Sequence, residues 1–119
     1  MARSTTTPQA IPVTGLNITD MTYDTLGVGA NNGVQFPYKL GDLILLNNNT
    51  GGAVTYTIKV PAPATLSALG ATVGDISVAV AAAKTVVYKS NAALRQSDGN
   101  VYIDCSAAAK LAVLSAQDN

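Results

Sequence analysis

Apolar and polar residues alternate along most of the chain after residue 40, with the two-residue period of a strand that is buried on one face. The segment VTYTIKV (54–60) shows this pattern most clearly. The segments DISVAV (75–80) and TVVYK (85–89) repeat it, and AAAK (81–84) is expected to make a tight connection between them. The residues expected to point inward are Val54, Tyr56, Ile58, Val60, Ile76, Val78 and Val80.

Two further segments have longer apolar runs. GDLILLNN (41–48) is a short continuous apolar stretch between turn-forming residues, which is typical of a strand covered on both faces. The Asn- and Gly-rich cluster that follows it leads into residues 54–60, so we predict a hairpin there. KLAVLSAQ (110–117) is expected to form the last strand. The alanine runs 81–83 and 107–109 are too short for a stable helix and are expected to lie in turns or at strand edges.

The N-terminal third is less regular. IPVTGLNI (11–18) and VQFPY (34–38) are its candidate strands, and residues 19–33 between them have neither period, so we expect a long loop. Residues 61–74 contain two prolines and two glycines and are also expected to form a loop, with room for one helical turn at 65–69.

These segments together predict an all-β protein, a small antiparallel β-sandwich or flattened barrel with an extended N-terminal arm. Residues 1–9 are expected to form the arm, and residues 10–119 a single β-sandwich domain. A chain of 119 residues is long enough to bury a core of its own without disulfides or metals.

The segment RQSDGNVYIDC (95–105) allows two interpretations, a reactive loop or a turn. Asp98 can hydrogen-bond its own backbone, and Gly99 can adopt the positive φ that a tight reversal needs, so the turn is favoured. After the turn, alternation places Asp104 on the face opposite Ile103 and Cys105. We therefore expect Asp104 to be solvated or at an interface, and Cys105 to be a small buried residue of a strand.

The residue composition argues against catalysis. The chain has no histidine, one cysteine, and acidic residues that are all aspartate, so the usual general base and the usual zinc ligands are missing. We expect no enzyme activity, no catalytic residues, no cofactor and no metal.

The charge pattern bears on partners. Seven basic and seven acidic residues give a formal net charge of zero, and the basic residues are spread along the chain. Binding to nucleic acid or to an anionic membrane would favour clustered Lys and Arg, so neither partner is expected. The N-terminal residues lack the apolar stretch of a secretory signal, and we expect synthesis in the cytoplasm of the producing cell.

The first nine residues, MARSTTTPQ, are small and polar with a proline, and cannot form a core. They are either a disordered terminus or an arm that becomes ordered by lying across a neighbouring subunit, for example at a sheet edge. The candidate residues for contact with a neighbour are Ala2, Arg3, Ser4, Thr5, Thr6, Thr7 and Pro8.

The chain as a whole resembles a known family. The opening MARSTT, the central ANNGVQF, GDLILLNNNTGG and AVTYTIKVPA, and then VGDISVAV and RQSDGNVYIDC are similar to the small head decoration (cement) proteins of tailed bacteriophages. The resemblance covers roughly residues 30–116. It departs from the family pattern at 89–92, where similar sequences more often have an apolar or proline-containing stretch.

The resemblance implies a non-enzymatic protein on the outer surface of the virion capsid that binds the major capsid protein and stabilises the expanded head. It also implies self-association, with a trimer favoured and a dimer compatible. A tail or head-fibre subunit is the main alternative. A carbohydrate-binding module is a weaker one, because the chain has no Trp to form an aromatic platform for a sugar.

Overall fold

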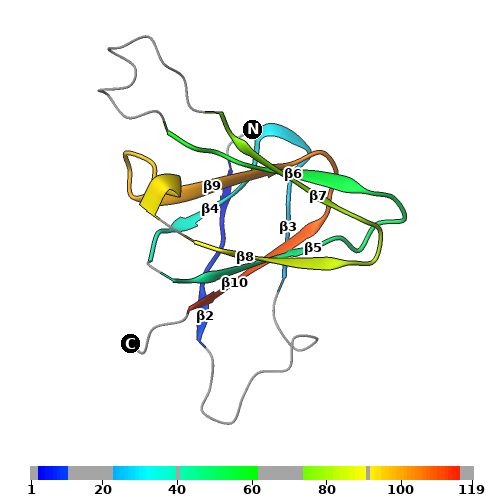
Figure 1. The fold of residues 1–119 in the computed structure, drawn as a ribbon, viewed down its shortest axis with the longest axis horizontal. Coiled ribbons are helices and arrows are strands. Elements are labelled where there is room, and N and C mark those ends of the chain that lie inside the picture. Colours follow the sequence, from blue (N-terminus) through cyan, green and yellow to red (C-terminus); the bar gives the residue numbers. More distant parts are fainter. Residues whose placement is uncertain (1–2, 11–22, 40, 62–73, 91, 116–119) are drawn as a thin grey trace.

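The computed structural model describes residues 3–10, 23–39, 41–61, 74–90 and 92–115. These residues form two five-stranded sheets packed face to face, so the predicted all-β sandwich is confirmed. Figure 1 shows the sheets as an upper and a lower layer. The only helix in the described ranges is a single 3₁₀ turn, Ala92–Leu94, between two strands.

The upper sheet, sheet A, and the lower sheet, sheet B, have different strand orders. Sheet A consists, in spatial order, of β1 (Ser4–Thr5), β4 (Gly29–Pro37), β9 (Asn100–Cys105), β6 (Val54–Ile58) and β7 (Ile76–Val80). Sheet B consists of β2 (Gln9–Ala10), β10 (Lys110–Ser115), β5 (Leu43–Asn47) and β8 (Thr85–Lys89), with β3 (Asp24–Thr25) also paired to β10.

Both sheets are mixed. The pairs formed among β4 to β10 are antiparallel, as predicted, but β1 pairs parallel with β4, and β2 pairs parallel with β10. The prediction of a purely antiparallel sandwich was therefore wrong for the N-terminal residues. The two sheets do not close into a barrel in the described part of the chain, so the sandwich and not the flattened barrel is formed.

The core lies between the sheets and follows the predicted alternation. In β6, Val54, Tyr56 and Ile58 are buried. The Tyr56 hydroxyl donates hydrogen bonds to the carbonyl oxygens of Asn47 (3.0 Å) and Lys110 (2.8 Å), so its one polar group is satisfied. Burial of Tyr56 raises the pKa of its phenol well above the ordinary value. Cys105 is also buried, as predicted.

The apolar run in β5 is covered on both faces, as predicted. Ile44 and Leu46 belong to the main core, whereas Leu45 packs with Ala112 of β10 in a second, smaller cluster on the other face. β5 and β10 lack regular alternation of apolar and polar residues because both of their faces are buried.

The predicted hairpin between residues 41–48 and 54–60 was wrong, because β5 and β6 lie in opposite sheets. β7 and β8 also lie in opposite sheets. Their tight connection exists, with the Lys84 N–H bonded to the Ala81 carbonyl at 3.2 Å, but it carries the chain from sheet A to sheet B. In the described part of the chain, β6 and β7 are the only strands consecutive in sequence that pair with each other.

The N-terminal third contains more strand than predicted. The candidate strand 34–38 lies largely in β4, but β4 begins at Gly29, and β3 precedes it, so the predicted loop 19–33 was too long. The candidate strand 11–18 and the candidate helical turn 65–69 lie outside the described residues.

Candidate functional site

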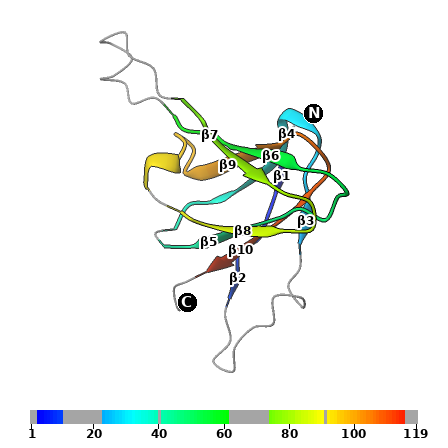
Figure 2. The same ribbon diagram turned by 45° about the vertical axis from the view of Figure 1, so that its right-hand side comes forward.

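The N-terminal arm is described from Arg3 to Gln9, and together with Ala10 it lies across both sheets of its own chain. Ser4 and Thr5 pair with Val34 and Gln35 of β4. Farther along, β2 pairs with the end of β10 in sheet B. Figures 1 and 2 show this blue segment running from the upper layer to the lower one. The arm therefore covers an edge of each sheet on one side of the sandwich.

The predicted contact residues differ in exposure. Ala2 lies outside the described residues. Ser4, Thr5 and Thr7 are exposed, and Arg3 and Pro8 are half-buried. Thr6 is only 2% exposed, and its N–H donates to the Gln35 carbonyl at 2.8 Å. Thr6 is thus buried although no described residue of the arm belongs to a hydrophobic core cluster, and contact of the arm with a neighbour stays a prediction.

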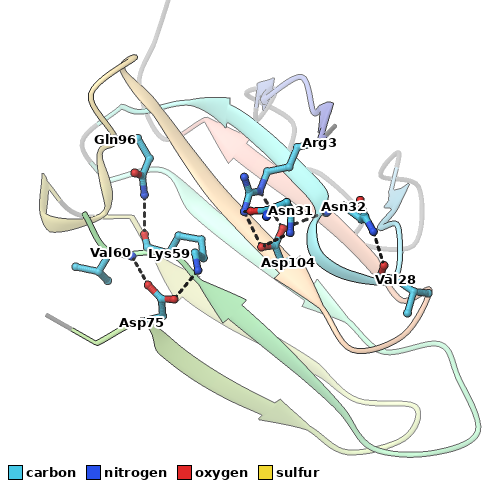
Figure 3. A network of polar contacts seen from close by, with 10 residues as sticks. Arg3, Val28, Asn31, Asn32, Lys59, Val60, Asp75, Gln96 and Asp104 are labelled. Carbon is cyan, nitrogen blue, oxygen red and sulfur yellow. Dashed lines mark hydrogen bonds and ion pairs between the residues drawn. The ribbon is translucent and has the colours of Figure 1, made fainter. Parts of the chain in front are cut away.

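Arg3 fixes the start of the arm through an ion pair with Asp104 of β9. The Arg3 Nε donates to Asp104 Oδ1 at 2.9 Å, and the Arg3 guanidinium donates to Asp104 Oδ2 at 2.6 Å. This bidentate geometry is among the stronger forms of ion pair in proteins, because two charge-assisted hydrogen bonds act in parallel. Figure 3 shows both bonds.

A bulge in β4 supplies the other partners of the carboxylate. The register of β4 with β9 shifts between Gly29 and Val34, and in this stretch the N–H groups of Asn31 and Gly33 turn toward Asp104. Asn31 donates to Oδ2 at 3.0 Å, and Gly33 donates to Oδ1 at 3.1 Å. Each carboxylate oxygen thus accepts one bond from Arg3 and one from the backbone.

The bulge has strict backbone requirements. Asn31 has a positive φ of 66°, which Asn tolerates better than most residues. A Cβ at Gly33 would stand 1.9 Å from the Ile103 carbonyl oxygen, so only glycine lets β4 approach β9 this closely. The segment ANNGV therefore forms the cradle of Asp104.

Asp104 was expected to be solvated or at an interface, and the first alternative was wrong, because the arm covers the carboxylate and leaves Asp104 5% exposed. Burial by itself raises the pKa of Asp104. The hydrogen bonds from Arg3 and from the Asn31 and Gly33 N–H groups outweigh burial and hold the pKa below its ordinary value. The carboxylate is therefore ionised near neutral pH, as the ion pair requires.

The ion pair of Arg3 with Asp104 is the anchor of the arm. The turn at Asp98 and Gly99 is linked to this anchor through Tyr102. Gly99 has a φ of +87°, and the Asp98 carboxylate accepts a hydrogen bond from the Asn100 N–H at 3.0 Å. The Tyr102 hydroxyl donates to the same carboxylate, and the Arg3 guanidinium lies 4.5 Å from the centre of the Tyr102 ring. The residues predicted as a turn and those predicted as an arm thus share one network.

A second polar cluster lies beside β6 and β7. The Lys59 ammonium is 2.7 Å from Asp75 Oδ2, and the Val60 N–H donates to Asp75 Oδ1 at 3.0 Å. The Gln96 side chain donates to the Lys59 carbonyl at 3.1 Å (Figure 3). These bonds hold the ends of β6 and β7 together, and the hydrogen bonds to Asp75 lower its pKa.

Between the two polar clusters the outer surface of sheet A is hollowed into a shallow depression of about 300 Å³. Its rim carries hydroxyl groups from Thr55, Thr57 and Ser106, and the Lys59 ammonium. In the described ranges no group of three or more Asp or Cys residues could hold a metal ion. No helix in those ranges is long and apolar enough to cross a bilayer.

No protein-family model, curated protein or solved structure matches this chain.

Proposed function

We propose that this chain is a structural virion protein that decorates the head of a tailed bacteriophage, binds the lattice of the major capsid protein and stabilises the expanded shell. Support comes from the resemblance over residues 30–116, which coincides with the framework from β4 to β10. The motifs of the resemblance are therefore the strands and turns of the two sheets themselves.

The observation that carries the proposal is the outer face of β6 and β7, defined by Thr55, Thr57, Ser77 and Ala79. The register pairs Thr55 with Ala79 and Thr57 with Ser77, so the four side chains form one patch. All are small and uncharged, and all except the half-buried Thr57 are exposed. Lys59 and Asp75 at its end neutralise each other.

Such a face suits contact with a protein lattice. Small uncharged side chains allow two backbones to approach closely and are cheaper to desolvate than charged groups. One contact of this kind is modest, but a shell presents many equivalent sites, and ordered contacts across neighbouring subunits add through multivalency. Binding to the intact shell alone then shifts the equilibrium toward that shell in proportion to occupancy.

A binding assay tests the proposed face. The purified chain is mixed with expanded shells of the major capsid protein encoded in the same genome, and bound protein is separated by sedimentation. Ser77→Arg should reduce binding about tenfold or more, because a buried unpaired charge is costly. The matched control is Asn49→Arg, an exposed position in the connection between β5 and β6. Equal binding of both variants would show that this face is not the contact.

A particle assay tests the function itself. Heads with and without the bound chain are heated, and DNA release is followed at several salt concentrations. The decorated heads should release DNA at a higher temperature, with little dependence on salt, because the proposed face carries no net charge. If the two kinds of head release DNA at the same temperature, the decoration role fails. A fibre subunit, or a sugar-binding module tested on a glycan array, would then be the better hypothesis.

A further inference from the structure

The side of the sandwich opposite the arm carries the outer edges of β7 in sheet A and β8 in sheet B. Within the described residues no strand pairs with either edge. An uncovered strand edge presents rows of N–H and C=O groups that can pair with another chain. Figures 1 and 2 show β8 at the margin of the lower layer.

The hydrogen bonds at the two ends of β8 show which of its backbone groups face outward. The Asn48 N–H donates to the Lys84 carbonyl at 3.0 Å, and the Ser90 N–H donates to the Asp42 carbonyl at 2.8 Å. Hydrogen-bonded pairs alternate along an antiparallel ladder, so the even-numbered residues of β8 bond to β5. The N–H and C=O groups of Thr85, Val87 and Lys89 therefore point away from the sheet.

The side chains of β8 divide in the same way. Val86 and Tyr88 face inward and are partly buried against the main core. Val87 faces outward and is 55% exposed, one of the two large apolar side chains that are exposed in the described part of the chain. The edge of β8 is thus apolar on its inner face and carries an exposed valine at the middle of its outer face.

We propose that β8 pairs antiparallel with β8 of a second copy of this chain, around a two-fold axis at Val87. In this register Val87 lies opposite its counterpart, and Thr85 lies opposite Lys89. Each outward-facing residue then both donates and accepts a backbone hydrogen bond, and sheet B becomes continuous across the two copies. The proposal does not depend on the proposed function.

Self-complementarity on both faces is the argument for a second copy as the partner. On the inner face, Val86 of one copy lies opposite Tyr88 of the other, a favourable pairing of β-branched and aromatic side chains that extends the core. On the outer face, Lys89 lies opposite Thr85. Just beyond the two ends of β8, Lys84 lies opposite Ser90. No two lysines stand directly opposite each other, so this register brings no like charges together. Lysines at an edge strand disfavour less specific pairing.

The length of the strand selects the same register. A shift by two residues in one direction places Lys89 opposite Ala83, which lies in the turn before β8 with a φ of 60° and cannot extend the ladder. A shift in the other direction leaves Thr85 opposite a residue beyond the end of β8. Only the register centred on Val87 pairs all of β8 with β8.

The mass of the chain in solution and the exchange of its backbone amides test the pairing directly. Sedimentation equilibrium over a concentration series should show a monomer–dimer equilibrium. Hydrogen exchange by NMR should show protection of the Thr85, Val87 and Lys89 amides that increases with concentration. A monomer at all concentrations, or a trimer without protection of these amides, would overturn the proposal. Protection that arises only on capsid shells would assign the edge to a capsid strand instead.

Charge variants at Val87 test the register. Val87→Lys and Val87→Glu should each weaken dimerisation about tenfold or more, because like charges would meet at the axis. An equimolar mixture of the two variants should dimerise again, since opposite charges then face each other. Ser77→Lys on the exposed face of β7 is the matched control and should leave the dimer unchanged. Weak dimerisation of the mixture would place the two-fold axis elsewhere, provided that each variant melts like the parent chain.

Discussion

The sheet edges on the two lateral sides of the sandwich differ in how their backbone groups are paired. On one side the N-terminal arm lies over the edges of both sheets, and a largely buried ion pair between Arg3 and Asp104 fixes it. On the other side the edges of β7 and β8 have no partner among the described residues. A sheet edge needs its hydrogen-bonding groups satisfied by something, whether chain, partner or water. The difference therefore separates a side built for stability from a side available for association.

Removal of the arm should have the largest effect. Deleting residues 1–9 exposes the edge of β4, removes most of the strand that pairs with the end of β10, and leaves the Asp104 carboxylate without its cation. Loss of one partner of a buried ion pair costs about 3–5 kcal/mol, so we expect a large fall in the free energy of unfolding, measured by urea denaturation. A truncated chain as stable as the full one would remove the distinction between the two sides.

Single substitutions should locate that loss in the anchor. Arg3→Ala and Asp104→Asn should each destabilise the fold by about 2–4 kcal/mol, because each leaves buried hydrogen-bonding groups without a charged partner. The double variant should lose much less than the sum of the two, and the difference measures their coupling. Arg95→Ala, at an exposed position, is the control. Additive losses would mean that Arg3 and Asp104 stabilise the protein independently.

Substitutions in the turn at Asp98 and Gly99 should affect stability mainly through the backbone conformation. A Cβ at Gly99 would meet no atom within 4 Å, so substitution there is opposed by its φ of +87° and not by crowding. We expect Gly99→Val to destabilise the fold by about 1–3 kcal/mol. Asp98→Asn should change the melting temperature little, since Asn supports the same turn. A parent-like melting temperature for Gly99→Val would contradict the turn as a structural requirement.

These effects follow from features that the sequence reveals to different degrees. Alternation in residues 54–60 and 75–80 predicted which side chains face the core, because that choice depends on local periodicity alone. It did not predict that β5 and β6 lie in opposite sheets, since a period of two says nothing about which strands pair. A strand shows the same alternation whether the loop that follows it leads to a paired strand or to the opposite sheet.

The ion pair between Arg3 and Asp104 could not be predicted from the sequence either, because local periodicity does not show which distant residues meet. Arg3 and Asp104 are separated by 101 residues, and alternation placed Asp104 on a face that only the arm covers. One signal was present in the segment ANNGV, because Asn and Gly side by side before an apolar strand are typical of a bulge that turns backbone N–H groups toward an acceptor. The acceptor itself could not be identified from spacing.

Acid should weaken the arm side selectively. The pKa of Asp104 is lower in the folded protein than the ordinary value of 3.8, so its ionised form stabilises the fold above that value. This contribution should decrease as the pH falls below about 4, through the folded-state pKa. Amide exchange of residues 4–6 should then accelerate before that of β8. The Asp104→Asn variant is the control, and the same acid response in both proteins would assign the effect to other carboxylates.

Changes on the opposite side should have the smallest effect on stability. Val87 is more than half exposed, and its outward backbone groups bond to nothing in the described part of the chain. At concentrations too low for association, Val87→Lys should therefore change the free energy of unfolding by less than about 0.5 kcal/mol. At high concentration the parent should gain stability through dimerisation, whereas the variant should not. Melting curves of both proteins over a concentration series measure this difference. If Val87→Lys destabilises the dilute monomer as much as Arg3→Ala does, the β8 edge belongs to the fold itself, and the contrast between the two sides fails.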